Sequence, residues 1–84
     1  MIMIIPSRMF KYDLKDALDR GVNINETGKC IDCLSMTGRC PEHLPDEALT
    51  EKMEGFRKCT IENKYQLVYR VGDKALYLFR YKTN

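Results

Sequence analysis

The strongest constraint on the fold is a pair of strand-like segments near the C-terminus. Apolar and polar residues alternate over Tyr65–Val71, with tyrosine, leucine and valine facing one way and glutamine, valine and arginine the other. Gly72, Asp73 and Lys74 then form a turn, and residues 75–81 repeat a strand pattern. This part of the chain is therefore predicted to be a β-hairpin.

The N-terminal half is predicted to hold a short strand and two helices. Residues 2–5 are apolar and strand-like, and Pro6 and Ser7 open a helix with Ser7 as its N-cap. Gly21 ends this helix, and its apolar stripe consists of Phe10, Leu14, Ala17 and Leu18. A second helix is predicted over residues 25–36, closed by Gly38. Its predicted buried face consists of Cys30, Ile31, Cys33 and Leu34.

The remaining segments complete a two-layer architecture. Residues 39–48 contain Pro41 and Pro45 and are predicted to form a loop, whereas residues 55–62 are a further strand candidate. The order β-α-α-β-β-β predicts an α/β (α+β) two-layer sandwich, with two helices packed on a mainly antiparallel twisted sheet. The chain has 84 residues, so we expect residues 1–84 to form a single domain.

Composition excludes several classes of protein. The chain is 44% hydrophobic and 31% charged, which is typical of a globular rather than a disordered protein. Its apolar runs fall short of the roughly 20 residues that span a membrane, and the N-terminal run stops at Pro6 with no basic residue before it, unlike a signal peptide. The four cysteines are therefore expected to be reduced thiols in a cytoplasmic protein without disulfides.

The net charge of +2 hides an asymmetry along the chain. Residues 55–84 carry seven basic side chains and two acidic ones, whereas residues 42–54 carry five acidic side chains and one basic one. The basic part is a candidate surface for a polyanion. The alternative is that these charges only solubilise strand faces and loops.

Cysteine spacing provides a separate signal. The pattern Cys30-x2-Cys33-x6-Cys40-x2-His43 offers three thiolates and an imidazole, a ligand set that suits tetrahedral zinc. The six-residue spacer is shorter than in the usual zinc fingers. Cysteines on the apolar stripe of a helix also act as small hydrophobic residues, so both readings remain open, and Cys59 is expected in the core.

Several short segments carry a family resemblance. Residues 55–59, 61–62, 67–71 and 76–80 read Gly-Phe-Arg-Lys-Cys, Ile-Glu, Leu-Val-Tyr-Arg-Val and Leu-Tyr-Leu-Phe-Arg, and residues 7–15 read Ser-Arg-Met-Phe-Lys-Tyr-Asp-Leu-Lys. Together with the length of the loop at residues 40–49, these segments resemble the RelE/ParE toxin superfamily, and its YafQ branch most closely. The resemblance covers nearly the whole chain.

The resemblance implies a toxin of a type II toxin-antitoxin system. Such a toxin binds the ribosome and mRNA, cuts the mRNA as an endoribonuclease without a metal, and is silenced by a cognate antitoxin; it has no small-molecule substrate. The cut is an attack by a ribose 2′-hydroxyl on the adjacent phosphate. It requires a base, an acid and positive charge for the phosphorane.

The catalytic residues of that branch are largely replaced here. The resemblance places histidines at Glu47, Thr60 and Asn84 and an aspartate at Lys64, and it retains two arginines, Arg57 and Arg80. Arg57 and Arg80 are expected to stabilise phosphate charge, with Glu47 or Lys64 moving protons. Arg80 is expected on a different strand face from Tyr77, Phe79 and Tyr81. The predicted RNA-binding residues are Lys52, Lys58, Arg70, Tyr81 and Lys82, with Tyr81 as the base-stacking residue near an open end and Tyr65, Tyr69 and Tyr77 mostly structural.

Two alternatives are of a different class. The first is a catalytically inactive protein of the same fold, phage-borne or decayed, that acts by binding a protein partner. The second is a small zinc-binding module held by the cysteines and His43.

Overall fold

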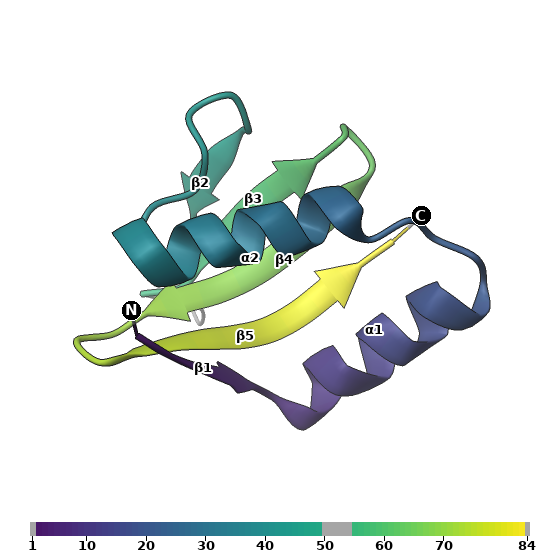
Figure 1. The fold of residues 1–84 in the computed structure, drawn as a ribbon, viewed down its shortest axis with the longest axis horizontal. Helices are drawn as coiled ribbons and strands as arrows, with labels where there is room; N and C mark the ends of the chain where they lie inside the picture. Colours follow the sequence, from purple (N-terminus) through teal and green to yellow (C-terminus); the bar gives the residue numbers. More distant parts are fainter. Residues whose placement is uncertain (1, 50–54, 84) are drawn as a thin grey trace.

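The computed structural model describes residues 2–49 and 55–83, which form two helices and a five-stranded sheet. The sheet order is β1-β5-β4-β3-β2, with β1 parallel to β5 and every other pair antiparallel. The elements in chain order are β1 (Met3–Pro6), α1 (Arg8–Asp19), α2 (Asn25–Thr37), β2 (Asp46–Ala48), β3 (Arg57–Ile61), β4 (Tyr65–Val71) and β5 (Ala75–Lys82). Figure 1 shows α2 lying across the sheet and α1 running beside β5. The predicted α+β fold with a C-terminal hairpin is confirmed.

Helix α1 begins where the sequence predicts. The Ser7 hydroxyl accepts a hydrogen bond from the Phe10 amide at 3.0 Å and donates one to the Phe79 carbonyl at 2.6 Å. The N-cap therefore also ties α1 to β5, at the point where β1 has ended at Pro6. Phe10 and Ala17 are buried, whereas Leu18 is half exposed because it lies beyond the face that meets the sheet.

Helix α2 supplies the other part of the cover. Gly38 ends it in the left-handed region, with φ at 74°, which a glycine adopts without strain. Cys30 and Leu34 are buried among the strands, as predicted. Cys33 is half-buried instead, and its sulfur contacts the Thr37 hydroxyl and the Arg39 carbonyl near the C-terminus of the helix.

The prediction that residues 39–48 are all loop is wrong at their C-terminal end. Asp46–Ala48 pair with β3 as strand β2, and the Pro45 carbonyl accepts a hydrogen bond from the Thr60 amide at 2.9 Å. Proline stops a helix, but it can precede an edge strand because only its carbonyl is needed there. Since the partner strand lies further along the chain, local pattern did not reveal the pairing.

Strand β5 contains a bulge, which reverses the side of the sheet that each following residue faces. Tyr69 pairs with Leu78 and Val68 with Arg80, so Phe79 is an extra residue. Strict alternation would place Arg80 on the same face as the buried Leu78. The bulge prevents this, since Arg80 shares a face with Val68 instead, and Tyr81 returns to the helix side.

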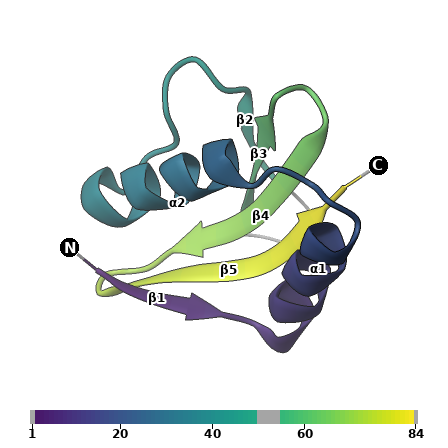
Figure 2. The same cartoon turned by 45° about the vertical axis from the view of Figure 1, so that its right-hand side comes forward.

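One core lies between the helices and the sheet, and Figure 2 shows the two helices flanking it. Its buried members from α1 and α2 are Phe10, Ala17, Cys30 and Leu34, and those from the strands are Cys59, Ile61, Leu67, Tyr69, Leu76, Leu78 and Tyr81. The Tyr81 and Thr27 hydroxyls share a buried hydrogen bond of 2.7 Å, so these polar groups cost little inside the core. Neither helix in the described part of the chain is long and apolar enough to cross a membrane.

Candidate functional site

The sheet face turned away from the helices gathers most of the predicted RNA-binding cations. Residues paired across strands point to the same face, and the registers place Lys58 beside Val68, Val68 beside Arg80, and Arg70 beside Tyr77. We call this surface the open face. Its members are Glu47, Phe56, Lys58, Thr60, Gln66, Val68, Arg70, Tyr77, Phe79, Arg80 and Lys82.

Two adjoining hollows lie on the open face, and a third adjoins them beside α1. One of about 380 Å³ is lined mainly by Ile5, Phe56, Arg70, Tyr77 and Phe79. A second hollow, of about 230 Å³, shares Phe79 with the first and is also lined by Arg80 and Lys82. A third of about 390 Å³ shares Arg80 and Lys82 with the second and reaches the end of α1, where Asp13, Asp16 and Arg20 line it. The surface is therefore aromatic at one end and charged at the other, where three basic side chains line the hollow beside two acidic ones.

The aromatic end has a fixed geometry. The Phe56 and Phe79 rings lie 5.2 Å apart at 55°, and the Arg70 guanidinium lies 6.0 Å from the Phe56 ring. Strict alternation already places Phe79 on the face of Tyr77, and the bulge adds Arg80 to that same face. Tyr77 lies beside the group and is 42% exposed.

Arg80 is held by Asp13 of α1. The Arg80 Nε donates to Asp13 Oδ2 at 2.7 Å and its Nη2 donates to Oδ1 at 3.1 Å, while the Tyr81 amide donates to Oδ2 at 3.0 Å. Burial acts to raise the pKa of Asp13, but these hydrogen bonds and the charges of Arg80 and Lys82 outweigh it and lower the pKa. The pair leaves both N–H groups of Arg80 Nη1 free of this carboxylate, so Arg80 can still donate to a phosphate.

Arg57 does not join Arg80 on the open face. It pairs with Tyr69, whose side chain is in the core, so the two arginines point to opposite faces of the sheet. The Arg57 Nε donates to Asp46 Oδ2 at 3.1 Å, and the Tyr69 hydroxyl donates to Asp46 Oδ1 at 2.8 Å. Arg57 was expected to stabilise phosphate charge as Arg80 does, but it lies on the opposite face from Arg80 and belongs to a hydrogen-bond network at the β2 edge.

The proton-transfer candidates are also separated. Glu47 and Lys58 are paired across β2 and β3 and form an ion pair of 3.0 Å on the open face. Lys64 is exposed in the turn between β3 and β4. Glu47 and Arg80 are three strand spacings apart, roughly 14 Å between Cα atoms. One phosphate could meet both side chains only if both leaned toward the middle of the sheet.

The predicted roles of Tyr77 and Tyr81 are exchanged, since Tyr81 is buried and Tyr77 is exposed. Tyr81 is 2% exposed, with its ring 6.4 Å from Phe10 and 6.0 Å from Tyr65, so it cannot stack on a base. Tyr69 is buried and structural, as predicted. Tyr77, which was expected to be structural, is the exposed one. The bulge is the cause, because it turns Tyr81 toward the helices.

The other predicted RNA-binding cations have mixed outcomes. Arg70 and Lys82 are exposed on the open face, and Lys58 is half-buried there in its pair with Glu47. Lys52 lies outside the described residues. Asp13, Phe56 and Phe79 were not predicted as site residues, and only the family-like Asp-Leu-Lys, Gly-Phe-Arg and Leu-Tyr-Leu-Phe-Arg segments carried any signal for them.

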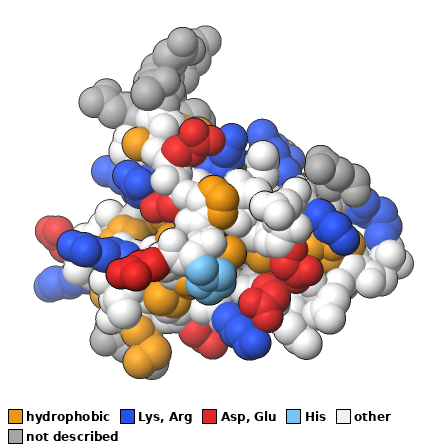
Figure 3. Space-filling model, turned by 90° about the horizontal axis from the view of Figure 1, so that it is seen from above, with side chains coloured by type: hydrophobic (Ala, Val, Ile, Leu, Met, Phe, Trp, Pro, Cys, Tyr) orange, Lys and Arg blue, Asp and Glu red, His pale blue; other side chains and the backbone are white. Residues whose placement is uncertain are grey.

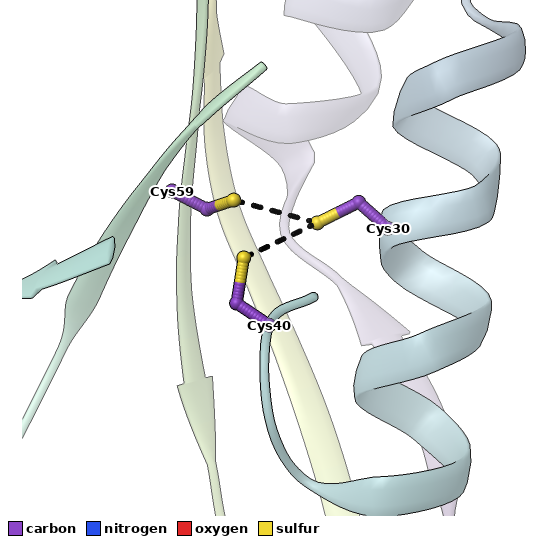
Figure 4. A group of neighbouring side chains, drawn as sticks. All are labelled: Cys30, Cys40 and Cys59. Atoms are coloured by element: carbon purple, nitrogen blue, oxygen red, sulfur yellow. Dashed lines mark hydrogen bonds between the residues drawn. The ribbon is translucent and has the colours of Figure 1, made fainter. Parts of the chain in front are cut away.

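The predicted zinc ligands do not assemble. Cys33 faces Thr37 and Arg39, and His43 is exposed. Figure 3 shows acidic and basic side chains interspersed over one face of the molecule. In the described residues the sulfurs of Cys30, Cys40 and Cys59 converge instead, all within 4.8 Å of one another (Figure 4). A zinc module held by Cys30, Cys33, Cys40 and His43 is therefore wrong for this fold.

Two helices over one face of a five-stranded, mostly antiparallel sheet, with a cationic open face, define a RelE-like α+β protein. The family model described as bacterial toxin of type II toxin-antitoxin system, YafQ, matches residues 2–83. The chain therefore belongs to the YafQ family of type II toxins. A search of curated protein sequences finds no significant match.

Solved structures of toxins superimpose closely on the chain. A copper-bound mutant toxin from Helicobacter pylori is 27% identical with a TM-score of 0.91, over 100% of this chain and 96% of that one. YafQ from E. coli strain BL21(DE3) is 26% identical with a TM-score of 0.83, over 100% and 94%. The E. coli DinJ-YafQ toxin-antitoxin complex contains a chain 26% identical with a TM-score of 0.86, over 98% and 91%.

Proposed function

We propose that this toxin binds mRNA at the ribosome through its open face. The observation that carries the proposal is the joining of a cationic hollow, at Arg80 and Lys82, to an aromatic one, at Phe56 and Phe79. Positioned cations bind the phosphates of a single strand, and aromatic faces accept unstacked bases. The proposal requires the cytoplasm, where ribosomes are.

The open face also offers groups for metal-free cleavage. In the proposed reaction, Glu47 takes the proton of the ribose 2′-hydroxyl, and the freed oxygen attacks the adjacent phosphorus. The bond from phosphorus to the 5′-oxygen breaks, and Lys58 donates a proton to that leaving oxygen. Arg80 stabilises the charge of the phosphorane through the N–H groups that Asp13 leaves free, and both Arg80 and Glu47 lean toward the middle of the sheet to reach the same phosphate. Lys64 has no assigned step, since it lies in the β3–β4 turn.

A protein antitoxin is the proposed regulatory partner. The E. coli relative is solved as the DinJ-YafQ complex, and a toxin of this family requires a means of silencing. We expect the product of an adjacent short reading frame to copurify with the chain and to relieve growth inhibition when both are expressed.

A bacterial translation extract tests the proposal. The wild-type chain is expected to stop translation and to generate new mRNA 5′ ends, whereas Arg80→Ala is expected to lose both effects because it removes the positioned guanidinium. Arg80 also closes an ion pair within the fold, so Lys82→Ala serves as a second variant; Lys82 is exposed and its loss should weaken inhibition with the fold intact. Lys29→Ala, an exposed cation paired with Glu26 on α2, is the charge-matched control.

The outcomes separate two functions. New mRNA ends that depend on Arg80 support the proposed ribonuclease. Failure of the wild type both to bind RNA and to inhibit translation would contradict the proposal. Inhibition without new ends would instead support an inactive protein of the same fold that acts by binding. The wide separation of Glu47 from Arg80 favours this second candidate.

A further inference from the structure

The one cluster of potential metal ligands in the described residues lies away from the open face. Cys30 comes from α2, Cys40 from the segment between α2 and β2, and Cys59 from the middle of β3 (Figure 4). Cys59 pairs with Leu67 on the helix side of the sheet. The cluster is therefore separated from Arg80 and Lys82 by the sheet itself.

The spacing of the sulfurs suits a metal ion. Cys30 Sγ lies 3.5 Å from Cys59 Sγ and 3.9 Å from Cys40 Sγ, and the three sulfurs lie within 4.8 Å of one another. An ion at the centre of an equilateral sulfur triangle with sides of about 4 Å lies about 2.3 Å from each sulfur, which is the length of a metal–thiolate bond in proteins. Packing as a small hydrophobic residue explains each cysteine singly, but not why three sulfurs from three segments converge.

The surroundings indicate which ion the cluster would hold. Asp46 pairs with Cys59 across β2 and β3, but the Asp46 carboxylate accepts hydrogen bonds from Arg57 and Tyr69. The described ligand set is therefore three thiols. Closed zinc sites use four ligands, whereas a thiolate-only set selects soft ions, and copper(I) is stable with three.

We propose that Cys30, Cys40 and Cys59 bind one copper(I) ion in a three-coordinate thiolate site. The ion enters as copper(I), replaces the thiol protons, which pass to solvent, and changes no oxidation state. Cys40 is half-exposed and provides the entry side, whereas Cys30 and Cys59 are 1% and 0% exposed. The site joins α2 to β3 and secures the segment that leads into β2.

The test is an anaerobic titration of the full chain with copper(I), in competition with a chromophoric copper(I) chelator. The cysteines of the chain are kept reduced throughout. We expect one ion per chain and an X-ray absorption spectrum of three sulfurs at one short distance. Cys40→Ser removes a half-exposed ligand and should leave the fold intact. Loss of a group that only contacts a metal ligand lowers metal affinity by roughly tenfold to hundredfold. Cys40→Ser removes a ligand itself, so we expect a larger loss of copper(I) affinity. Circular dichroism checks the fold of each variant.

Cys33→Ser is the matched control, because Cys33 lies three residues from Cys30 but faces Thr37. It should bind copper(I) as the wild type does. Equal loss of binding in Cys33→Ser and Cys40→Ser would overturn the proposal, and so would a wild-type affinity no higher than that of Cys40→Ser. Zinc(II) is titrated in parallel, and tighter binding of zinc than of copper(I) at the same cysteines would also overturn the assignment. None of these readouts depends on toxin activity.

Discussion

At the scale of single residues, Asp13 has the most demanding role in the described site. It accepts three hydrogen bonds, from Arg80 Nε, Arg80 Nη2 and the Tyr81 amide, and its side chain is only 17% exposed. It therefore satisfies a backbone donor at the edge of β5 that β1 does not reach. The Asp13 carboxylate also sets the direction of Arg80, which the family resemblance predicts to be a site residue and which lies on the open face.

We predict that Asp13→Asn destabilises the chain by about 2 kcal/mol at neutral pH, because charge-assisted hydrogen bonds to Arg80 are replaced by weaker ones. The pKa of Asp13 is lowered from 3.8 in the folded chain. Its contribution is thus present above about pH 4 and is lost as the pH falls through the folded value. Urea unfolding across pH measures the difference, which should be largest near pH 7 and vanish in acid.

Asp16→Asn is the control for this prediction. Asp16 pairs with Arg20 on the surface of α1, and its side chain is 67% exposed. Surface pairs of this kind contribute less than about 0.5 kcal/mol. An equal effect of the two substitutions would show that the Asp13–Arg80 pair has no special stabilising role.

At the scale of elements, the start of α1 depends on one hydroxyl with two partners. The Ser7 hydroxyl accepts from Phe10 and donates to Phe79, so it caps the helix and attaches it to the bulge of β5. We predict that Ser7→Ala lowers the free energy of unfolding by about 1–2 kcal/mol, since it loses a cap and leaves a carbonyl without its partner. Thermal or urea unfolding measures the loss.

Ser7→Thr keeps the hydroxyl and should recover most of that stability, because threonine is also an accepted N-cap. A Ser7→Thr variant as unstable as Ser7→Ala would mean that side-chain volume matters at this position, rather than hydrogen bonding.

The elements also show which parts of the fold local sequence could predict. The strands of the hairpin, the Ser7 cap and the Gly38 end of α2 all follow from patterns within one segment, and all are confirmed. Strand β2 was missed because its partner lies in β3, beyond residues 50–54. The bulge at Phe79 was missed because it depends on how β4 and β5 are registered, which a strict period of two does not reveal.

At the scale of the whole molecule, the two sides of the sheet carry different kinds of residues. The helix side holds the core, the Asp46 network and the cysteine cluster. The open face holds Arg70, Arg80 and Lys82 beside exposed or partly exposed aromatic rings. A partner with phosphates would therefore bind on the face that the helices leave uncovered.

We predict that single-stranded RNA binding weakens with salt in proportion to the number of cations engaged on the open face. For single strands, the slope of log affinity against log salt is about 0.7 per phosphate contact. The double variant Arg70→Ala with Lys82→Ala should therefore reduce the slope by about 1.4. Fluorescence anisotropy with a labelled oligonucleotide at several salt concentrations measures it.

The matched double variant is Lys29→Ala with Arg39→Ala, which removes the same charge from α2 and the segment after it. Its slope should equal that of the wild type. Equal losses in the two double variants would show that binding follows net charge and not the open face.

The sequence by itself determined every described element except β2, the α+β class and the family, because helix caps, turn glycines and strand alternation act over a few residues. It also identified Arg80, Arg70 and Lys82 as cations of interest. Only the tertiary structure decided which side chains share a face: it turned Tyr81 inward, separated Arg57 from Arg80, and replaced Cys33 and His43 with Cys59 beside Cys30 and Cys40. The reason is that the side of the sheet to which a side chain points depends on strand register and on one bulge. Both are set by pairing between segments distant along the chain.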